Sequence, residues 1–301
     1  MSIKTIGLLS PGDMGHVVAK VLHSHGLRVL TCLKGRSERT RMLARQAQIE
    51  AVPTHEELVA KTEMLLSIVV PEAALGTAHL VAEALRAAGQ MTTYVDCNAV
   101  SPGTVKAIAD VIVSVGSRFV DAGIIGPPPR QPGVTRFYAS GPEVERFAAL
   151  ANFGLDIRPL GQGIGLASGL KMCYAALTKG MTAIATELLV TAHTMGLYEP
   201  LVAEWQLSQK DRYRTIERQL PVMPTKAGRW ISEMEEIAKT FGDIGLTPKI
   251  HLGAADIYRF VGTSPLAEET PETRDHDRTL AQVIEGLAAH LQESTAPRLR
   301  S

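Results

Sequence analysis

The first half of the chain alternates two hydrophobic periods, and this alternation limits the possible folds more than any other feature. Short β-branched runs bounded by Gly, Pro, Asn or Asp alternate with longer segments whose apolar residues recur three and four positions apart. This pattern predicts βαβ units, and hence an α/β Rossmann-type domain with a doubly wound, mostly parallel sheet. The predicted strands are 3–9, 28–33, 64–70, 93–95, 118–122 and 135–140, and the predicted helices are 14–24, 37–45, 54–60, 73–88, 104–115 and 144–151.

After a glycine-rich stretch at 161–165, the pattern becomes almost entirely helical. We therefore expect a dinucleotide-binding domain at residues 1–160 and an all-α domain for substrate binding and dimerisation at 161–301. Residues 166–195 contain no proline and predict one helix of about 30 residues, about 45 Å long, with a kink at Gly180 as the alternative. Helices of this length usually cross between domains or subunits. Its apolar stripe consists of Leu166, Leu170, Tyr174, Leu177, Met181, Ile184 and Leu188.

Charge and cysteine content exclude several classes of partner. The chain has 31 Lys and Arg against 31 Asp and Glu, so it has no general attraction for nucleic acid or for an anionic membrane. Its three cysteines lie far apart without metal-ligand spacing, so we predict no metal site. We see no signal peptide and no apolar stretch of about 20 residues, and therefore expect a cytoplasmic protein that binds a small molecule.

A glycine-containing turn joins the first predicted strand to the first predicted helix. A pyrophosphate approaches a helix N-terminus only where the backbone is unobstructed, so Gly12 leaves room for it and Gly15 lets the helix pack on the strand. Ser10 replaces the first glycine of the usual pattern, and an ordinary turn of a flavodoxin-like protein is the alternative. The predicted cofactor contacts are Ser10, Pro11, Gly12, Asp13, Met14 and Gly15, with Val70, Pro71 and Asn98 further along the chain.

The second predicted strand ends in basic residues. A site selective for NAD has an Asp or Glu about 20 residues beyond the glycine turn, whereas residues 34–45 hold five basic residues and only Glu38 as an acid. A guanidinium and a serine hydroxyl suit a phosphate monoester, so Arg36 and Ser37, assisted by Lys34, favour NADP over NAD. For the other arginines, Arg39, Arg41 and Arg45, the alternative is a solvated helix face.

Lys171 follows the glycine-rich stretch and is the predicted general acid and base. Its neighbours one helical turn away are all small, which leaves room for a ligand beside it. A desolvated lysine beside an oxidised nicotinamide has its ammonium form disfavoured, which brings its pKa toward the working pH. The alternative is a lysine whose stem packs while its amine reaches water.

Four motifs in chain order resemble those of the β-hydroxyacid dehydrogenases, the superfamily that includes 3-hydroxyisobutyrate, tartronate semialdehyde and 6-phosphogluconate dehydrogenases. Gly7–Gly15 resembles the family's GFIGxGxMG opening, and Asp96–Pro102 stands where the family has D-x-S-T…P. Phe119–Pro127 stands where the family has its DAPVSGG substrate loop. Gly161, Gly163 and Lys171 stand where it has GxGxxxK with the catalytic lysine.

The resemblance implies hydride transfer between the nicotinamide and a substrate carbinol carbon, with Lys171 shuttling the hydroxyl proton, and a homodimer formed through helices. Ala175 replaces the family's asparagine, Ile125 replaces the serine of the substrate loop, and Pro127 replaces its second glycine. These departures indicate a larger and more apolar pocket than a short 3-hydroxy acid needs. The predicted substrate contacts are Ile124, Ile125, Gly126, Tyr174 and Ala175.

We therefore predict an NADP-dependent oxidoreductase that acts on the CH–OH group of a small hydroxy acid or related alcohol. An imine reductase or reductive aminase is one alternative; those enzymes usually carry Asp or Tyr where this chain has Lys171, but Tyr174 keeps the reading open. A catalytically inactive dinucleotide-binding protein is the other alternative, because Ser10, Ala175 and Ile125 all depart from the family. The sequence leaves open whether the pocket is lined by Arg130, Trp205, Trp230 and Tyr258.

Overall fold

The computed structural model describes residues 3–295 and divides into two compact units, with the boundary between Cys173 and Tyr174. One long helix, α7 (Leu166–Thr194), contributes its first two turns to the first unit and the rest to the second. The prediction of one helix over 166–195 is therefore confirmed. Across residues 3–295, no helix has both the length and the apolarity to cross a membrane.

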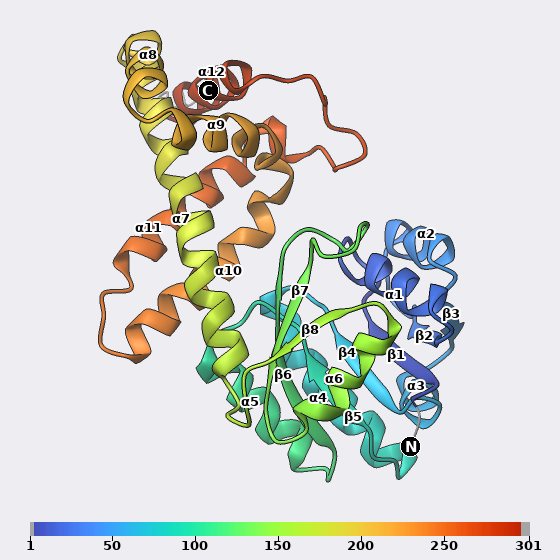
Figure 1. Cartoon of the computed structure of the whole chain (residues 1–301). Helices are drawn as coiled ribbons and strands as arrows, with labels where there is room; N and C mark the ends of the chain where they lie inside the picture. Colours follow the sequence, from blue (N-terminus) through green and yellow to red (C-terminus); the bar gives the residue numbers. More distant parts are fainter. Residues whose placement is uncertain (1–2, 296–301) are drawn as a thin grey trace, which may run out of the picture. The chain divides into compact units, whose positions relative to one another are not determined.

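The first unit is built on a single sheet (Figure 1). Within residues 3–295 it has eight strands in the order β3-β2-β1-β4-β5-β6-β7-β8. Neighbouring strands are parallel except for β6 and β7, which pair antiparallel. The strands are β1 (Thr5–Leu9), β2 (Arg28–Cys32), β3 (Glu50–Val52), β4 (Met64–Ser67), β5 (Thr93–Asp96), β6 (Arg118–Ile125), β7 (Arg136–Ser140) and β8 (Asp156–Pro159).

Helices cover both faces of this sheet, so the prediction of a doubly wound α/β domain is confirmed. One hydrophobic cluster joins the sheet to α1 and α6, and a second joins it to α3, α4 and α5. The helices of this unit are α1 (Gly15–Ser24), α2 (Glu38–Gln46), α3 (His55–Ala60), α4 (Pro71–Ala88), α5 (Pro102–Val113) and α6 (Val144–Ala148), followed by the short helix η1 (Ala149–Phe153).

The strand predictions were incomplete at the two edges of the sheet and at β6. Neither β3 nor β8 was predicted, because these short edge strands expose much of their length and lack a buried apolar run. Strand β6 extends to Ile125, three residues beyond the predicted end at Ala122. A glycine such as Gly123 often marks the end of a strand, but here it lets the strand and α7 pack closely together. A Cβ added to Gly123 would lie 2.8 Å from the Ala167 carbonyl oxygen.

The second unit, as far as the structure describes it to residue 295, contains only helices and loops, as predicted. Tyr258 is fully buried and donates its hydroxyl to the Lys179 carbonyl oxygen at 2.6 Å, so it belongs to the core of this unit. Trp230 packs edge-on against Tyr258, with ring centroids 5.2 Å apart. The remaining helices are α8 (Tyr198–Ser208), α9 (Lys210–Gln219), η2 (Leu220–Val222), α10 (Pro224–Asp243), α11 (Lys249–Gly262), η3 (Pro265–Ala267) and α12 (Leu280–Thr295).

The predicted apolar stripe of α7 is on the surface of the chain. All seven of its residues are between 38% and 69% exposed, and Leu177 is the most exposed. The opposite face of α7 is buried and combines small residues such as Ala175 and Ala183 with the larger Met172 and Leu189. An amphipathic helix normally turns its large apolar side chains inward, so this surface is suited to contact with another surface.

Candidate active site

The loop after β1 has the close backbone approach that a dinucleotide site needs. A Cβ added to Gly15 would lie 2.6 Å from the Ser10 carbonyl oxygen, so only glycine allows α1 to begin there. Ser10 has a φ of 70°, the left-handed conformation that glycine adopts at low cost. By contrast, apart from Gly12 itself and its two chain neighbours, no heavy atom of residues 3–295 lies within 4 Å of a Cβ built on Gly12. Gly12 thus faces open space, where a phosphate can approach the backbone.

The same loop is held rigid by groups outside the glycine pattern. The backbone N–H of His16 donates to the Gly12 carbonyl oxygen at 3.0 Å, and its ring Nδ1 lies 2.7 Å from the same oxygen. Since a carbonyl only accepts, Nδ1 carries the proton. Within the described chain, the N-cap residue Met14 offers α1 no side-chain hydrogen bond. The backbone N–H groups at this helix end, with the positive end of the helix dipole, fit a pyrophosphate.

The residues predicted to bind the 2′-phosphate of NADP follow the end of β2. Lys34 and Ser37 are exposed and Arg36 is half-buried. The Ser37 hydroxyl caps α2 by accepting from the backbone N–H of Thr40 at 3.3 Å. Burial first, and then the nearby charges of Arg36 and Lys34, lower the pKa of His55 at the start of α3. His55 thus lies near these two cations and its charged form is disfavoured there, a proximity that local sequence spacing did not predict.

The other arginines of α2 have different surroundings. Arg39 donates from Nη2 to Asp13 Oδ1 at 2.6 Å and so ties α2 to the glycine loop. The alternative reading of a solvated face is therefore wrong for Arg39. Arg45 pairs with Glu38 at the surface, with 2.8 Å between Nη2 and Oε1, so for Arg45 the solvated face is correct.

Asn98 lies in a buried polar network at the ends of β4 and β5. Its Oδ1 accepts from the Val69 backbone N–H at 2.7 Å, and its Nδ2 donates to Asp96 Oδ2 at 2.8 Å and to Ser67 Oγ at 3.1 Å. The side chain is 2% exposed. Asn98 thus shapes the loop before α4. Two further predicted cofactor contacts lie where this helix begins: Val70 is its exposed N-cap residue, and Pro71 is its first residue.

Lys171 lies on α7 against β6 and is held in a defined position. Its Nζ donates to the Ile124 carbonyl oxygen at 2.7 Å. Gly123 makes this packing possible, because an added Cβ would lie 2.9 Å from the Cβ of Lys171. The two elements meet more closely than any larger residue at position 123 would allow. The amine is therefore presented beside the strand that carries the predicted substrate loop.

Asp121, also on β6, is fully buried and binds the first turn of α7. Its Oδ2 accepts from the backbone N–H groups of Gly165 at 2.9 Å and Ser168 at 3.2 Å, and from Ser140 Oγ at 3.0 Å. Its Oδ1 accepts from Ser168 Oγ at 2.6 Å. Burial raises the pKa of Asp121, and these hydrogen bonds oppose that rise.

The remaining predicted substrate contacts differ in accessibility. Ile124 and Ile125 are 7% and 4% exposed, and Gly126 has a φ of 121° that only glycine adopts readily. Tyr174 is 46% exposed, whereas Ala175 is 1% exposed. Ala175 therefore offers almost no surface of its own to a ligand.

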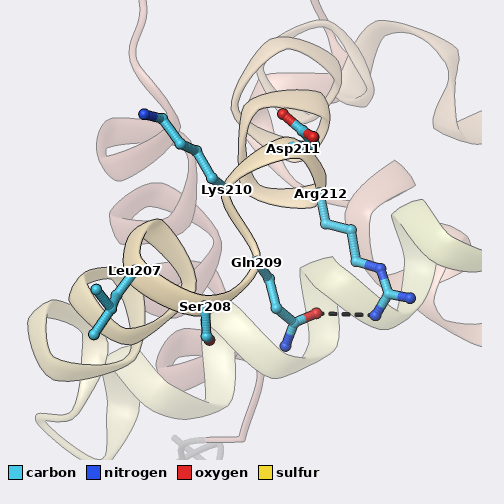
Figure 2. Close-up of a pocket in the computed structure, with 6 residues that line it drawn as sticks. All are labelled: Leu207, Ser208, Gln209, Lys210, Asp211 and Arg212. Carbon is cyan, nitrogen blue, oxygen red and sulfur yellow. Dashed lines mark hydrogen bonds between the residues drawn. The ribbon is translucent and has the colours of Figure 1, made fainter.

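Two hollows lie elsewhere, in the second unit. Figure 2 shows one at the junction of α8 and α9, formed by residues 207–212, where Arg212 Nη1 donates to Gln209 Oε1 at 2.9 Å. These consecutive, solvent-exposed residues surround no buried acid or base. Trp205 lines a second, apolar groove with Met181, Ile184 and Leu188 of α7. Within residues 3–295, no cluster of three His, Cys, Asp or Glu side chains is arranged to hold a metal ion.

Comparison with known proteins agrees with this geometry. Residues 3–148 match the NAD binding domain of 6-phosphogluconate dehydrogenase, and residues 192–261 match a domain of unknown function, DUF1932. An uncharacterised 28.5 kDa protein from Methanothermus fervidus is 30% identical over 197 residues, which cover 65% of this chain and 74% of that protein. A solved structure of a conserved protein of unknown function is 29% identical to this chain, and it is reported to be structurally similar to 3-hydroxyacid dehydrogenases. The two structures match with a TM-score of 0.63 over 85% of this chain and 97% of the other. The chain belongs to the β-hydroxyacid dehydrogenase family.

Solved members of the β-hydroxyacid dehydrogenase family have the same fold. The 3-hydroxyisobutyrate dehydrogenase of Mycobacterium tuberculosis is 18% identical, with a TM-score of 0.65 over 95% of this chain and 99% of its own. Imine reductases also share this fold. The predictions of a divergent family member, of an NAD(P)-binding domain and of an oxidoreductase of the CH–OH type are confirmed at the level of the family.

Proposed function

We propose that this protein is an NADP-dependent oxidoreductase that interconverts a small hydroxy acid, or a related alcohol, and its carbonyl compound. The observation that carries this proposal is the hydrogen bond from Lys171 Nζ to the Ile124 carbonyl oxygen at 2.7 Å. It holds an amine on the strand of the substrate loop, in the same unit as the glycine loop after β1. A dinucleotide site and a positioned proton carrier are the two parts that such an enzyme needs.

The cofactor loop fits a dinucleotide in its backbone and favours NADP in its charge. The open side of Gly12 and the N-terminus of α1 would receive the pyrophosphate. Lys34, Arg36 and the Ser37 hydroxyl would hold the 2′-phosphate. The one acid at the start of α2, Glu38, is engaged by Arg45, so it does not oppose a phosphate there.

The chemistry assigned to this chain is proton transfer. A bound nicotinamide supplies the acceptor or donor of the hydride. During alcohol oxidation Lys171 takes the hydroxyl proton as the carbinol C–H bond breaks, and during carbonyl reduction it returns that proton to the oxygen. The carbonyl oxygen of Ile124 keeps the amine in place while its protonation state changes.

The substrate is a small molecule with an apolar substituent. Ile125 stands at the serine position of the family's substrate loop and Ala175 at its asparagine position, so two polar contacts are replaced by hydrocarbon. A carboxylate held only by such groups would lose its hydrogen bonds. We therefore favour hydroxy acids with a bulky apolar group, or alcohols without a carboxylate, over short 3-hydroxy acids.

Imine reduction is the second candidate. Tyr174, one helical turn beyond Lys171, is 46% exposed and offers a phenolic proton donor. An imine reductase of this kind would reduce a C=N bond, and its turnover would depend on Tyr174 more than on Lys171. An inactive dinucleotide-binding protein would bind NADPH and turn over neither class of compound.

A homodimer is the assembly that the second unit favours. The exposed stripe of α7 includes Leu177, Met181, Ile184 and Leu188, and the last three line an apolar groove with Trp205 and Ile216. Covering such a stripe removes large apolar side chains from water, which is a main driving force of association. A second copy offers the same stripe in return, as a two-fold interface requires.

The test of function uses the full-length protein and one matched pair of variants. Purified protein is incubated with NADP⁺ and a panel of hydroxy acids and alcohols, and with NADPH and a panel of ketones, with and without amines. We expect alcohol oxidation that falls at least 100-fold in Lys171→Ala and much less in Tyr174→Phe. The reverse order with ketone and amine mixtures would establish imine reduction, and unchanged alcohol oxidation in Lys171→Ala would refute the mechanism.

A further inference from the structure

We propose that Asp121 is a positioning residue for Lys171: its buried carboxylate fastens the first turn of α7 to β6 and thereby sets where the lysine amine lies. This inference rests on the proposed role of Lys171 and extends it to a residue that does not touch the reacting atoms. It arises from four hydrogen bonds that converge on one side chain, described above.

These hydrogen bonds need a carboxylate. Asp121 accepts from two backbone N–H groups and two hydroxyls through its two oxygens. Asparagine has one oxygen, and its amide would present N–H groups to other donors, so it would leave some of them unsatisfied. The backbone donors lie at the N-terminus of α7, where the helix dipole favours a negative charge. The side chain is 0% exposed, so water would not replace a lost partner.

A second tether reinforces the first. Ser140 on β7 donates its hydroxyl to Asp121 and accepts from the backbone N–H of Ala167 at 3.1 Å. Strands β6 and β7 pair in this region, with Asp121 directly opposite Ser140. The start of α7 is therefore bound to two strands of a rigid sheet through one carboxylate and one hydroxyl.

The register of β6 and α7 links this anchor to the amine. Asp121 binds Ser168, and three residues further along each element the Ile124 carbonyl accepts from Lys171. From Asp121 to Ile124 the strand advances about 10 Å, whereas from Ser168 to Lys171 the helix advances about 4.5 Å. The extended side chain of Lys171 spans the difference between these two lengths. Gly123 lies between the two contacts and leaves no space for α7 to shift toward β6. If the Asp121 anchor is lost, the turn that carries Lys171 is free to move away.

The experiment measures first how accessible and reactive the amine is, and then the effect on turnover. The variants are Asp121→Asn and the milder Ser168→Ala, which removes one hydroxyl and keeps a helix-forming residue. Ser117→Ala is the matched control: its hydroxyl accepts from the Thr92 backbone N–H at 3.2 Å, it is 4% exposed, and it precedes the opposite end of β6. Circular dichroism establishes whether each variant is folded. If Asp121→Asn does not fold, the test is made with Ser168→Ala alone.

The first readout needs no substrate. The rate of acetylation of Lys171 by limiting acetic anhydride is measured by peptide mass spectrometry, relative to the exposed Lys4. We expect this ratio to rise several-fold in Asp121→Asn and about two-fold in Ser168→Ala, and to be unchanged in Ser117→Ala. An unchanged ratio in both folded test variants would overturn the inference.

The second readout is a double-mutant cycle on kcat. If Asp121 acts through Lys171, Asp121→Asn lowers kcat about tenfold or more in the wild-type background and has little further effect in Lys171→Ala. Equal effects in both backgrounds would mean a general structural role and would overturn the inference. Failure of the proposed function is distinguishable, because Lys171→Ala would then leave turnover unchanged while the acetylation ratio still reports on the anchor.

Discussion

The Ser10 carbonyl oxygen lies 2.6 Å from the position that a Cβ on Gly15 would occupy. This contact joins the end of β1 to the start of α1 and leaves no room for adjustment, because the atom met is backbone. It explains why the chain keeps this glycine although serine has replaced the first glycine of the pattern. The serine is accommodated by a left-handed backbone at φ 70°, whereas a Cβ at position 15 is not accommodated.

Gly15→Ala should therefore weaken NADPH binding by at least tenfold, because α1 must shift away from the loop and the pyrophosphate loses aligned N–H groups. Fluorescence titration with NADPH measures this. Gly76→Ala is the control: outside the neighbouring backbone of α4, no heavy atom of residues 3–295 lies within 4 Å of its added Cβ. The substitution should stabilise α4 by about 1 kcal/mol without affecting binding. Equal NADPH affinity in both variants would contradict the proposed phosphate site.

Arg36→Ala should raise the Kd for NADPH at least tenfold and change the Kd for NADH less than about twofold, because a charge-assisted hydrogen bond to a 2′-phosphate is worth about 1.5–3 kcal/mol. Arg45→Ala is the control, since Arg45 pairs with Glu38 at the surface. The same titration with both cofactors gives the result. Tighter binding of NADH than NADPH by the wild type would reverse the choice of cofactor.

Asp96 should make stability depend on pH. Burial above all, and then the charge of Asp121, raise the pKa of Asp96 from 3.8 to about 7, although hydrogen bonds from Asn98 oppose the rise. The folded protein then holds this proton more tightly than the unfolded chain. Its contribution to stability is complete below about pH 4 and is lost as the pH rises to about 7.

Urea unfolding of the wild type and Asp96→Asn at pH 4.5, 6 and 8 measures this contribution. The free energy of unfolding of the wild type should fall relative to that of the variant by about 1.4 kcal/mol per pH unit between pH 4 and 7, and then level off. The surface variant Asp110→Asn corrects for the general effect of losing a carboxylate. A constant difference between wild type and Asp96→Asn would show that Asp96 is ionised throughout this range.

Leu177→Glu should dissociate the proposed homodimer, because Leu177 is 69% exposed at the centre of the α7 stripe and a buried charge there would be unpaired. Ile244→Glu is the control, since Ile244 is 73% exposed at the end of α10, outside the stripe. Sedimentation velocity across a range of protein concentrations distinguishes the two forms. A wild-type monomer at all concentrations would remove the dimer from the proposal.

The sequence was informative wherever the fold buries a regular pattern. The central strands and most helices were predicted because their residues are apolar at the expected spacing, and Lys171 was found through the glycines before it. Edge strands β3 and β8 were missed because half-exposed residues show no such period. Secondary-structure patterns are local, so they describe the interior of the sheet better than its borders.

Contacts between residues distant in the chain could not be predicted from local sequence patterns. Asp121 was visible as part of a motif, but its partners Gly165, just before α7, and Ser168, on α7, are 44 and 47 positions away. No local spacing predicts a cap from such a distance. The pairing of Arg39 with Asp13 was hidden for the same reason, 26 positions apart. His16 was overlooked because a histidine within an apolar helix face resembles core packing, whereas its ring binds the Gly12 carbonyl.

One continuous helix, α7, carries both Lys171 and the apolar residues from Leu177 to Leu188. One uninterrupted ladder of main-chain hydrogen bonds joins these residues. If the stripe is the interface of the proposed homodimer, the side chains that meet the second copy and the proposed proton carrier belong to a single element of the chain. A measurement of turnover on the dissociated Leu177→Glu variant would then tell whether catalysis needs the paired form.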